Sequence, residues 1–260
     1  MAFETIFYET AGKVATIRFN RPHRLNAVVS ELYSETITAL KEAERDPAIA
    51  VIVLTGEGRA FCVGADLKEH KSGSRTELEK LQYLQLGNDI CRTIRELDKP
   101  VIAAVNGYAL GAGAEITCSA DFILMKESAQ IGFPEISIGT HLGGGVTEIM
   151  PRLVGLSKAR YLIFSGERIN GAEAARIGLA TRSFPDEAFE AGVAAFAAMI
   201  GAKAPYSMKF AKRLLNDAQQ DFDSRLTAEL SALRTCMLTE DWREGVEAFA
   251  EKRAPVFKGR

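Results

Sequence analysis

The sequence predicts an α/β fold with a mainly parallel sheet, followed by a region that is entirely helical. Two continuous apolar runs, 50–54 and 101–105, are closed by Gly or Asn-Gly and are typical of fully buried strands. Segments 30–45 and 76–97 carry apolar side chains at helical spacing. Because strands alternate with helices, we expect the strands to pair in parallel. After about residue 186 only helical patterns remain.

The boundaries of the individual elements follow from local signals. Ser30 is placed as the N-cap of the first helix, and Pro47 lies just beyond its end. Pro100 likewise ends the second helix, and residues 14–19 alternate apolar and polar side chains as a half-buried strand does. Further strands are expected at 122–125 and 129–131, and helices at 187–200, 205–216, 222–235 and 241–253. Composition does not decide whether this helical tail is a small domain, a lid or an oligomerisation surface.

The composition is that of a packed globular protein that acts on small molecules. Of the 260 residues, 47% are apolar and 25% are charged, which excludes a disordered or fibrous chain. The net charge is -2 and no long Lys/Arg block occurs, which argues against a nucleic-acid partner. Residues 1–20 lack the basic start and apolar stretch of a targeting peptide, and the apolar run 193–202 is too short to span a bilayer. We therefore expect a cytoplasmic protein without a membrane partner.

The cysteines and histidines argue against disulfides and against a metal site. They are Cys62, Cys91, Cys118 and Cys236, and His23, His70 and His141. No CxxC or HExxH pattern occurs, and a chain of this size has no need of disulfides to build a core. We expect reduced thiols and no metal.

Three Gly-rich segments, at 56–66, 106–115 and 139–148, follow apolar strands and end where helices are expected to begin. Such turns expose backbone N–H groups in front of a helix dipole, which suits a phosphate or a developing oxyanion. A single segment would be read as a tight turn, but three in one chain favour a functional role. None matches GxxxxGK[ST], GxGxxG or GxSxG, so neither a nucleotide triphosphatase nor a serine hydrolase is indicated.

Four strings, in order and spacing, resemble the motifs of the crotonase (enoyl-CoA hydratase/isomerase) superfamily. They are NRP with LNA (20–27), AFCVGADLKE (60–69), KPVIAAVNGYALGAGAEI (99–116) and FPEISIGTHLGGG (133–145). The final EAFAEKRAPVFKGR is also similar, so the resemblance covers essentially the whole chain. It implies a crotonase-like spiral of ββα units as the catalytic core, residues 1–190. It also implies a C-terminal helical region, residues 191–260, that builds a homotrimer or a homohexamer made of two trimers.

The resemblance also places a catalytic site. By motif position, the two catalytic glutamates fall on Glu115 and Glu135, and the backbone N–H groups of an oxyanion hole fall on Ala65 and Ala112. The family commonly has Gly at the second of these two alanine positions, so the Ala112 methyl narrows the expected pocket. Gly143 matches a glycine whose N–H positions a carboxylate and the water.

The proposed reaction explains why two carboxylates are wanted. Hydration of a 2-enoyl thioester needs a base for the water at Cβ, an acid for Cα and donors for the enolate-like oxygen. We assign Glu135 as the proton donor and Glu115 as the residue that holds and activates the water. Neighbouring half-buried carboxyls titrate as a pair, so one can be protonated while the other is ionised. Residues twenty positions apart cannot share a helical face, so the fold must bring them together.

The resemblance implies no permanently bound cofactor, and it implies contacts with the coenzyme A of the thioester substrate. The residues expected to make these contacts are Arg24, Ala27, Ala65, Asp66 and Leu67, with Lys252 reaching the substrate of a neighbouring subunit. For Arg24 and Lys252, ordinary surface charge is an equally good interpretation. Leu233 stands where the family often has Phe, which predicts a weaker adenine contact.

The residues that follow Glu135 do not identify the acyl group of the substrate. His141, Leu142 and Val146 replace residues that are often Ile or Leu, Pro and Gly in hydratases of this type. His141 could contact substrate or act on a proton, although a structural role is the commoner one for a lone loop histidine. Side chains of 68–86 are expected to shape the acyl pocket.

Several functions are compatible with this resemblance. An enoyl-CoA hydratase is favoured because both glutamates are present, whereas an enoyl-CoA isomerase or another acyl-CoA reaction of the superfamily could use one. A non-catalytic acyl-CoA binder would be indicated by loss of a glutamate, and an RNA-binding homologue by a basic helix. Neither feature is present.

Overall fold

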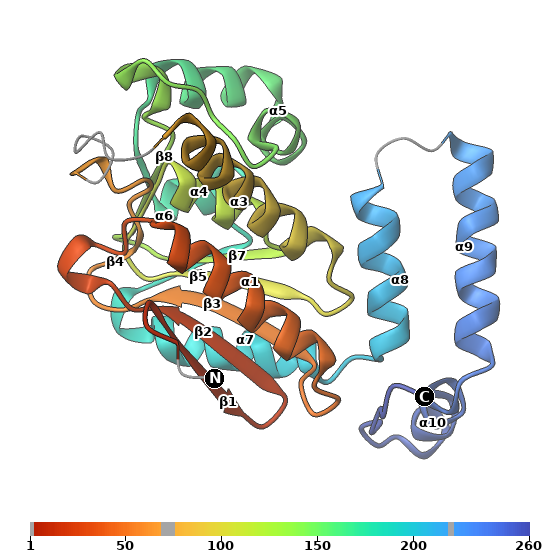
Figure 1. The fold of residues 1–260 in the computed structure, drawn as a ribbon. Coiled ribbons are helices and arrows are strands. Elements are labelled where there is room, and N and C mark those ends of the chain that lie inside the picture. Colours follow the sequence, from red (N-terminus) through yellow and green to blue (C-terminus); the bar gives the residue numbers. More distant parts are fainter. Residues whose placement is uncertain (1–2, 69–75, 218–220) are drawn as a thin grey trace.

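Two sheets form the centre of the body (Figure 1). The computed structural model describes residues 3–68, 76–217 and 221–260. The strands are β1 (Ile6–Ala11), β2 (Val14–Phe19), β3 (Val51–Gly56), β4 (Ala60–Cys62), β5 (Val101–Val105), β6 (Tyr108–Leu110), β7 (Phe122–Lys126), β8 (Gln130–Gly132), β9 (Ile169–Asn170) and β10 (Arg182–Phe184). The larger sheet has the order β1-β2-β3-β5-β7-β10 and the smaller one β4-β6-β8-β9. All neighbours pair in parallel except β1 with β2 and β8 with β9.

The chain moves repeatedly from the larger sheet to the smaller sheet and then into a helix. β3, β5 and β7 lie side by side in the larger sheet, and each is followed by a strand of the smaller sheet, β4, β6 or β8. The helices that come next are α3 (Glu77–Glu96), α4 (Ala112–Ser119), and η2 (Glu135–Ile138) with α5 (Val146–Ser165). This succession is a spiral of ββα units and confirms the predicted fold class.

Both faces of the larger sheet are covered, which explains its continuous apolar strands. Ile52 and Leu54 of β3 lie in one core with side chains of α1 (Ser30–Arg45) and α3. Val51 and Val53 of the same strand point the other way and pack against α7 (Phe189–Gly201). The remaining helical elements of the body are η1 (Pro22–Arg24), α6 (Gly171–Arg176) and η3 (Asp186–Ala188).

The starts of α3 and α1 are fixed by different local contacts. Thr76 and Glu79 form a capping box at the start of α3: Thr76 N–H donates to Glu79 Oε2 at 2.7 Å, and Glu79 N–H donates to Thr76 Oγ1 at 3.3 Å. The prediction that Ser30 caps α1 is wrong, because Ser30 is the first helical residue and Val29 is the N-cap. A bridge of Val28 to Ala65 keeps the preceding chain extended, and α1 begins directly after it.

The C-terminal helices α8 (Pro205–Asn216), α9 (Phe222–Met237) and α10 (Glu240–Glu251) stand beside the body (Figure 1). Lys212 of α8 docks on the body, where its Nζ donates to Ile94 O at 2.8 Å, Lys99 O at 3.0 Å and Asp121 Oδ2 at 2.7 Å. α9, whose residues are all described, buries none of them. It exposes an apolar row made of Phe222, Leu226, Leu230, Leu233 and Met237.

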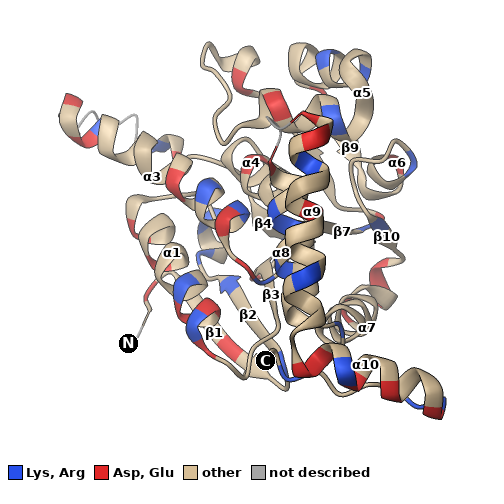
Figure 2. Cartoon of the chain, turned by 90° about the vertical axis from the view of Figure 1, so that its right-hand side faces the viewer, with Lys and Arg blue, Asp and Glu red and all other residues tan. Residues whose placement is uncertain are grey.

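Acidic and basic residues alternate along α9, whereas α8 carries only basic residues and α10 mainly acidic ones (Figure 2). No helix within residues 3–68, 76–217 and 221–260 is long and apolar enough to cross a membrane.

Candidate active site

The smaller sheet brings Glu115 and Glu135 together. β6 and β8 pair in parallel, with Leu110 opposite Gly132, so both strands end at the same edge. The chain leaves β6 into α4, where Glu115 is the fourth residue, and leaves β8 into η2, which begins at Glu135. Both carboxylates therefore lie beyond the carboxyl ends of adjacent parallel strands, the usual position of sites in α/β sheets.

Glycines allow the two carboxylates to sit this close to the backbone. Gly111, which precedes α4, has φ +55, and a Cβ there would lie 2.9 Å from Glu135 Oε1. A Cβ on Gly143 would lie 3.2 Å from Glu115 Oε2. The glutamate side chains themselves are only 9% and 7% exposed, so the pair is largely withdrawn from water.

Glu115 is held by the third Gly-rich segment, 139–148. The Gly143 N–H donates to Glu115 Oε1 at 2.7 Å, and the next N–H, of Gly144, donates to Asn88 Oδ1 at 3.4 Å. Burial raises the pKa of Glu115, while the Gly143 N–H and the charge of His141 lower it. The donor favours the ionised form that a base requires.

Glu135 is in a different environment. Its pKa is raised to about 7: burial raises it most, the charge of Glu115 also raises it, and its own N–H and His141 lower it. Its Oε2 is buried and has no hydrogen-bond partner among the described residues. A buried oxygen without a partner is rare in a folded protein and fits a place where substrate binds. Glu135 thus holds a proton into the neutral range, as a general acid requires.

Two backbone donors beside the carboxylates are free within the described part of the chain. Val28 N–H donates to Gly64 O at 2.8 Å and Asp66 N–H donates to Val28 O at 3.1 Å, so the intervening Ala65 N–H points away from Val28. Ala112 is the first residue of α4, where a helix offers no internal acceptor for the N–H.

The segments that carry these two donors are in contact. Gly64 has φ +88, and a Cβ there would lie 3.4 Å from Ala112 N. The Ala65 and Ala112 N–H groups therefore lie at one place in the fold, next to the glutamates.

The structure assigns Asp66 a role within its own loop. Its Oδ2 lies 3.3 Å from Arg21 Nη2 in an ion pair, and Arg21 also donates to Ala27 O. Arg21 thus ties the segment of Ala27 to the Ala65 loop, a function that the sequence reasoning missed. The signal was available, because Arg21 stands inside the NRP string.

The other predicted substrate contacts occupy different positions. Arg24 ends η1 and Leu67 follows the Ala65 loop, and both are exposed, whereas Ala27 is buried. Lys252 is exposed at the end of α10, which Figure 1 places away from α4, so the chain does not bring it to its own glutamates. Of the segment expected to shape the acyl pocket, residues 69–75 lie outside the described residues. Three side chains of its helical part are exposed: Leu78, Leu81 and Leu84.

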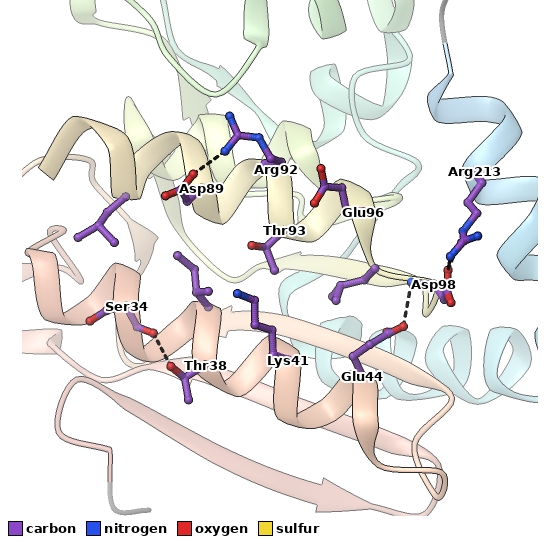
Figure 3. Close-up of a pocket in the computed structure, with 13 residues that line it drawn as sticks. Ser34, Thr38, Lys41, Glu44, Asp89, Arg92, Thr93, Glu96, Asp98 and Arg213 are labelled. Atoms are coloured by element: carbon purple, nitrogen blue, oxygen red, sulfur yellow. Dashed lines mark hydrogen bonds and ion pairs between the residues drawn. The ribbon is translucent and has the colours of Figure 1, made fainter. Parts of the chain in front are cut away.

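A hollow of about 700 Å³ between α1 and α3 does not contain the glutamates (Figure 3). Two ion pairs line it: Arg92 pairs with Asp89 at 2.5 Å, and Arg213 of α8 pairs with Asp98 at 2.7 Å. Glu44 accepts from the Asp98 N–H at 3.1 Å. We assign this hollow no part in the chemistry. In the described portion of the chain, no three His, Cys, Asp or Glu side chains are grouped as a metal ion would require.

Known proteins are similar to this chain in sequence and in fold. The sequence profile of the family described as enoyl-CoA hydratase/isomerase matches residues 9–260. A short-chain-enoyl-CoA hydratase of Clostridium acetobutylicum is 38% identical over 97% of each chain, and a crotonyl-CoA hydratase of Syntrophomonas wolfei is 36% identical over 99% of each. The crystal structure of an enoyl-CoA hydratase from Bacillus anthracis superposes with a TM-score of 0.94 at 33% identity, covering 99% of this chain and 100% of that one. The chain therefore belongs to the enoyl-CoA hydratase/isomerase family.

Proposed function

We propose that this protein is an enoyl-CoA hydratase that adds water reversibly to a 2-trans-enoyl-CoA and gives a 3-hydroxyacyl-CoA. The observation that carries the proposal is the buried pair of Glu115 and Glu135, one oriented by a backbone donor and the other with a free oxygen and a pKa of about 7. The names of the relatives in Clostridium acetobutylicum and Syntrophomonas wolfei support the same reaction and make crotonyl-CoA the natural first substrate.

In the proposed mechanism the thioester oxygen accepts from the Ala65 and Ala112 N–H groups, which stabilise the enolate-like negative charge. Glu115 takes a proton from water while the water oxygen bonds to Cβ, and Glu135 gives its proton to Cα. One water is added in total, and a proton must then pass from Glu115 to Glu135 before the next turnover. The reverse sequence dehydrates the 3-hydroxyacyl-CoA.

The second carboxylate favours hydration over isomerisation. Moving a proton between Cα and Cγ needs one base, whereas here a second buried carboxylate, Glu115, is oriented by its own donor at 2.7 Å. An isomerase would have no evident use for that arrangement.

For the substrate we propose coenzyme A contacts at Arg24, Ala27, Ala65, Asp66 and Leu67. The Asp66 contact is made by its backbone, because its carboxylate pairs with Arg21. Lys252 of one subunit is proposed to reach the substrate of the next, since it lies away from its own glutamates. No permanently bound cofactor enters the proposed mechanism.

We propose residues 1–190 as the catalytic core and 191–260 as the oligomerisation region of a homotrimer or homohexamer. The exposed apolar row of α9 supports this, because the described residues of the same chain do not cover these side chains. α7 crosses the division and packs on the sheet, so α8, α9 and α10 are the part that reaches outward.

The test is the loss of conjugated-thioester absorbance when the purified protein meets crotonyl-CoA. We expect activity in the wild type and losses of about 10²-fold or more in Glu115→Gln and Glu135→Gln. Full activity in both variants would overturn the mechanism. A silent wild type that still binds coenzyme A would favour another acyl-CoA reaction or a binding protein.

A further inference from the structure

One peptide group, which joins Leu142 to Gly143, is hydrogen bonded on both sides. Its N–H donates to Glu115 Oε1 at 2.7 Å, and its carbonyl oxygen lies 2.9 Å from His141 Nδ1. A carbonyl oxygen can only accept, so the hydrogen in this second contact belongs to Nδ1. The imidazole is therefore connected to the candidate base through a single amide.

Two hydrogen bonds in series through one peptide group couple the imidazole of His141 to the carboxylate of Glu115. A donor on the carbonyl oxygen polarises the amide and makes its N–H a stronger donor, because hydrogen bonds in series reinforce one another. The effect is larger when the first donor carries a positive charge. A positively charged His141 would thus both strengthen the Gly143 contact and act directly on the carboxylates.

The loop that holds His141 also fixes the position of the peptide. Glu135 begins η2, and Gly139 ends it in a left-handed conformation with φ +75. Gly144 and Gly145 follow with φ +61 and +78, and a Cβ on Gly144 would lie 3.0 Å from the Cβ of Glu115. The loop therefore passes tightly over Glu115, and a donor at residue 141 can hold the orientation of its central peptide.

We propose that His141 is a positioning residue for Glu115, acting through the Leu142–Gly143 peptide. The inference rests on the proposed hydratase function, in which Glu115 receives the proton of water. It gives His141 a defined role: it keeps the base oriented and favours its ionised form.

The groups around Glu115 come from several elements, and few of them titrate near neutrality. They are Tyr33 of α1, Cys62 of β4, Cys91 of α3, Cys118 of α4, Glu135 of η2 and His141. Burial raises the pKa of the Cys62 and Cys91 thiols to about 12 and raises that of Cys118 and of the Tyr33 phenol as well. These four groups do not titrate in the range of Glu115. A change in the pKa of Glu115 upon substitution of His141 therefore does not come from them.

Two substitutions at residue 141 separate the donor from the ring. His141→Leu removes the hydrogen bond and the charge, whereas His141→Asn can place its amide hydrogen where Nδ1–H was. We expect His141→Leu to lower kcat for crotonyl-CoA about tenfold with KM changed less than about twofold, and His141→Asn to recover most of that loss. If the leucine variant does not fold, His141→Ala makes the same comparison.

A second readout does not depend on activity. The ¹³C carboxyl signal of Glu115, assigned by its loss in Glu115→Gln, is followed against pH in the wild type and in the variants at position 141. Since His141 and the Gly143 donor lower the pKa of this group, the midpoint should rise in His141→Leu and rise less in His141→Asn.

The outcomes are distinct. An unchanged Glu115 midpoint in a folded His141→Leu protein would overturn the inference even if kcat fell, because a loop defect alone would then explain the loss. Equal kcat in His141→Leu and wild type would overturn it as well. A shifted midpoint in a protein that does not hydrate crotonyl-CoA would support the link from His141 to Glu115 while refuting the hydratase.

Discussion

Replacing Gly111 with alanine should disable the site while leaving the fold intact. Gly111 has φ +55 and ψ -125, a conformation that glycine adopts and other L-residues rarely do, so a side chain there is strained by about 1–3 kcal/mol. The added Cβ would lie 2.9 Å from Glu135 Oε1, which is closer than the 3.4–4 Å of ordinary contact. The carboxylate must therefore move by about half an ångström or more, and displacements approaching 1 Å cost roughly 10²-fold in rate.

The assay compares kcat and KM for crotonyl-CoA with the thermal midpoint of unfolding. Gly12→Ala is the matched control, because Gly12 has φ +57 in the turn between β1 and β2, and no atom lies within 4 Å of its added Cβ. Both variants place a side chain at a positive φ, but only Gly111→Ala should lose most of its kcat. Wild-type kcat in a folded Gly111→Ala protein would refute the placement of Glu135.

Three further predictions concern pH, docking of the tail and assembly. Because Glu135 must be protonated to act as the acid and its pKa is about 7, kcat/KM for hydration should fall as pH rises through about 7, and a rate that stays flat to pH 9 would contradict this assignment. Lys212→Met and Asp121→Asn should each destabilise the fold by about 3 kcal/mol, because each leaves the other charge of the pair without its partner in the protein interior. In denaturant titrations the double variant should lose less stability than the sum of the two single losses. Leu230→Glu, which introduces a charge into the exposed apolar row of α9, should reduce the mass measured by light scattering to that of a monomer, whereas Glu229→Gln on the same helix should not; an unchanged mass in Leu230→Glu would refute α9 as the interface.

The sequence predicted several buried strands and helices well because their patterns are local, although the range of α5 was not predicted. β5, α1 and α8 match the expected ranges residue for residue, since apolar runs and helical periodicity report burial directly. The strands β4 and β6 were missed because each has only three residues and lies inside a segment interpreted as a Gly-rich turn. β1 was missed because only Ile6 is buried in it.

The site could be predicted in its residues but not in its geometry. Neither the pairing of β6 with β8 nor the free oxygen of Glu135 has any local signal, because both depend on contacts between distant segments. The Arg21 to Asp66 ion pair joins residues 45 positions apart and is invisible for the same reason. The motif strings nevertheless mark these segments, which is why the resemblance found residues that propensity could not.

The most direct test of the central claim is the product formed from crotonyl-CoA in D₂O, followed by NMR. If Glu115 and Glu135 carry out hydration, the wild type should yield 3-hydroxybutyryl-CoA with deuterium at Cα, and Glu135→Gln should form it about 10²-fold or more slowly. Formation of a 3-enoyl-CoA without added water, or hydration at the wild-type rate by Glu135→Gln, would contradict it.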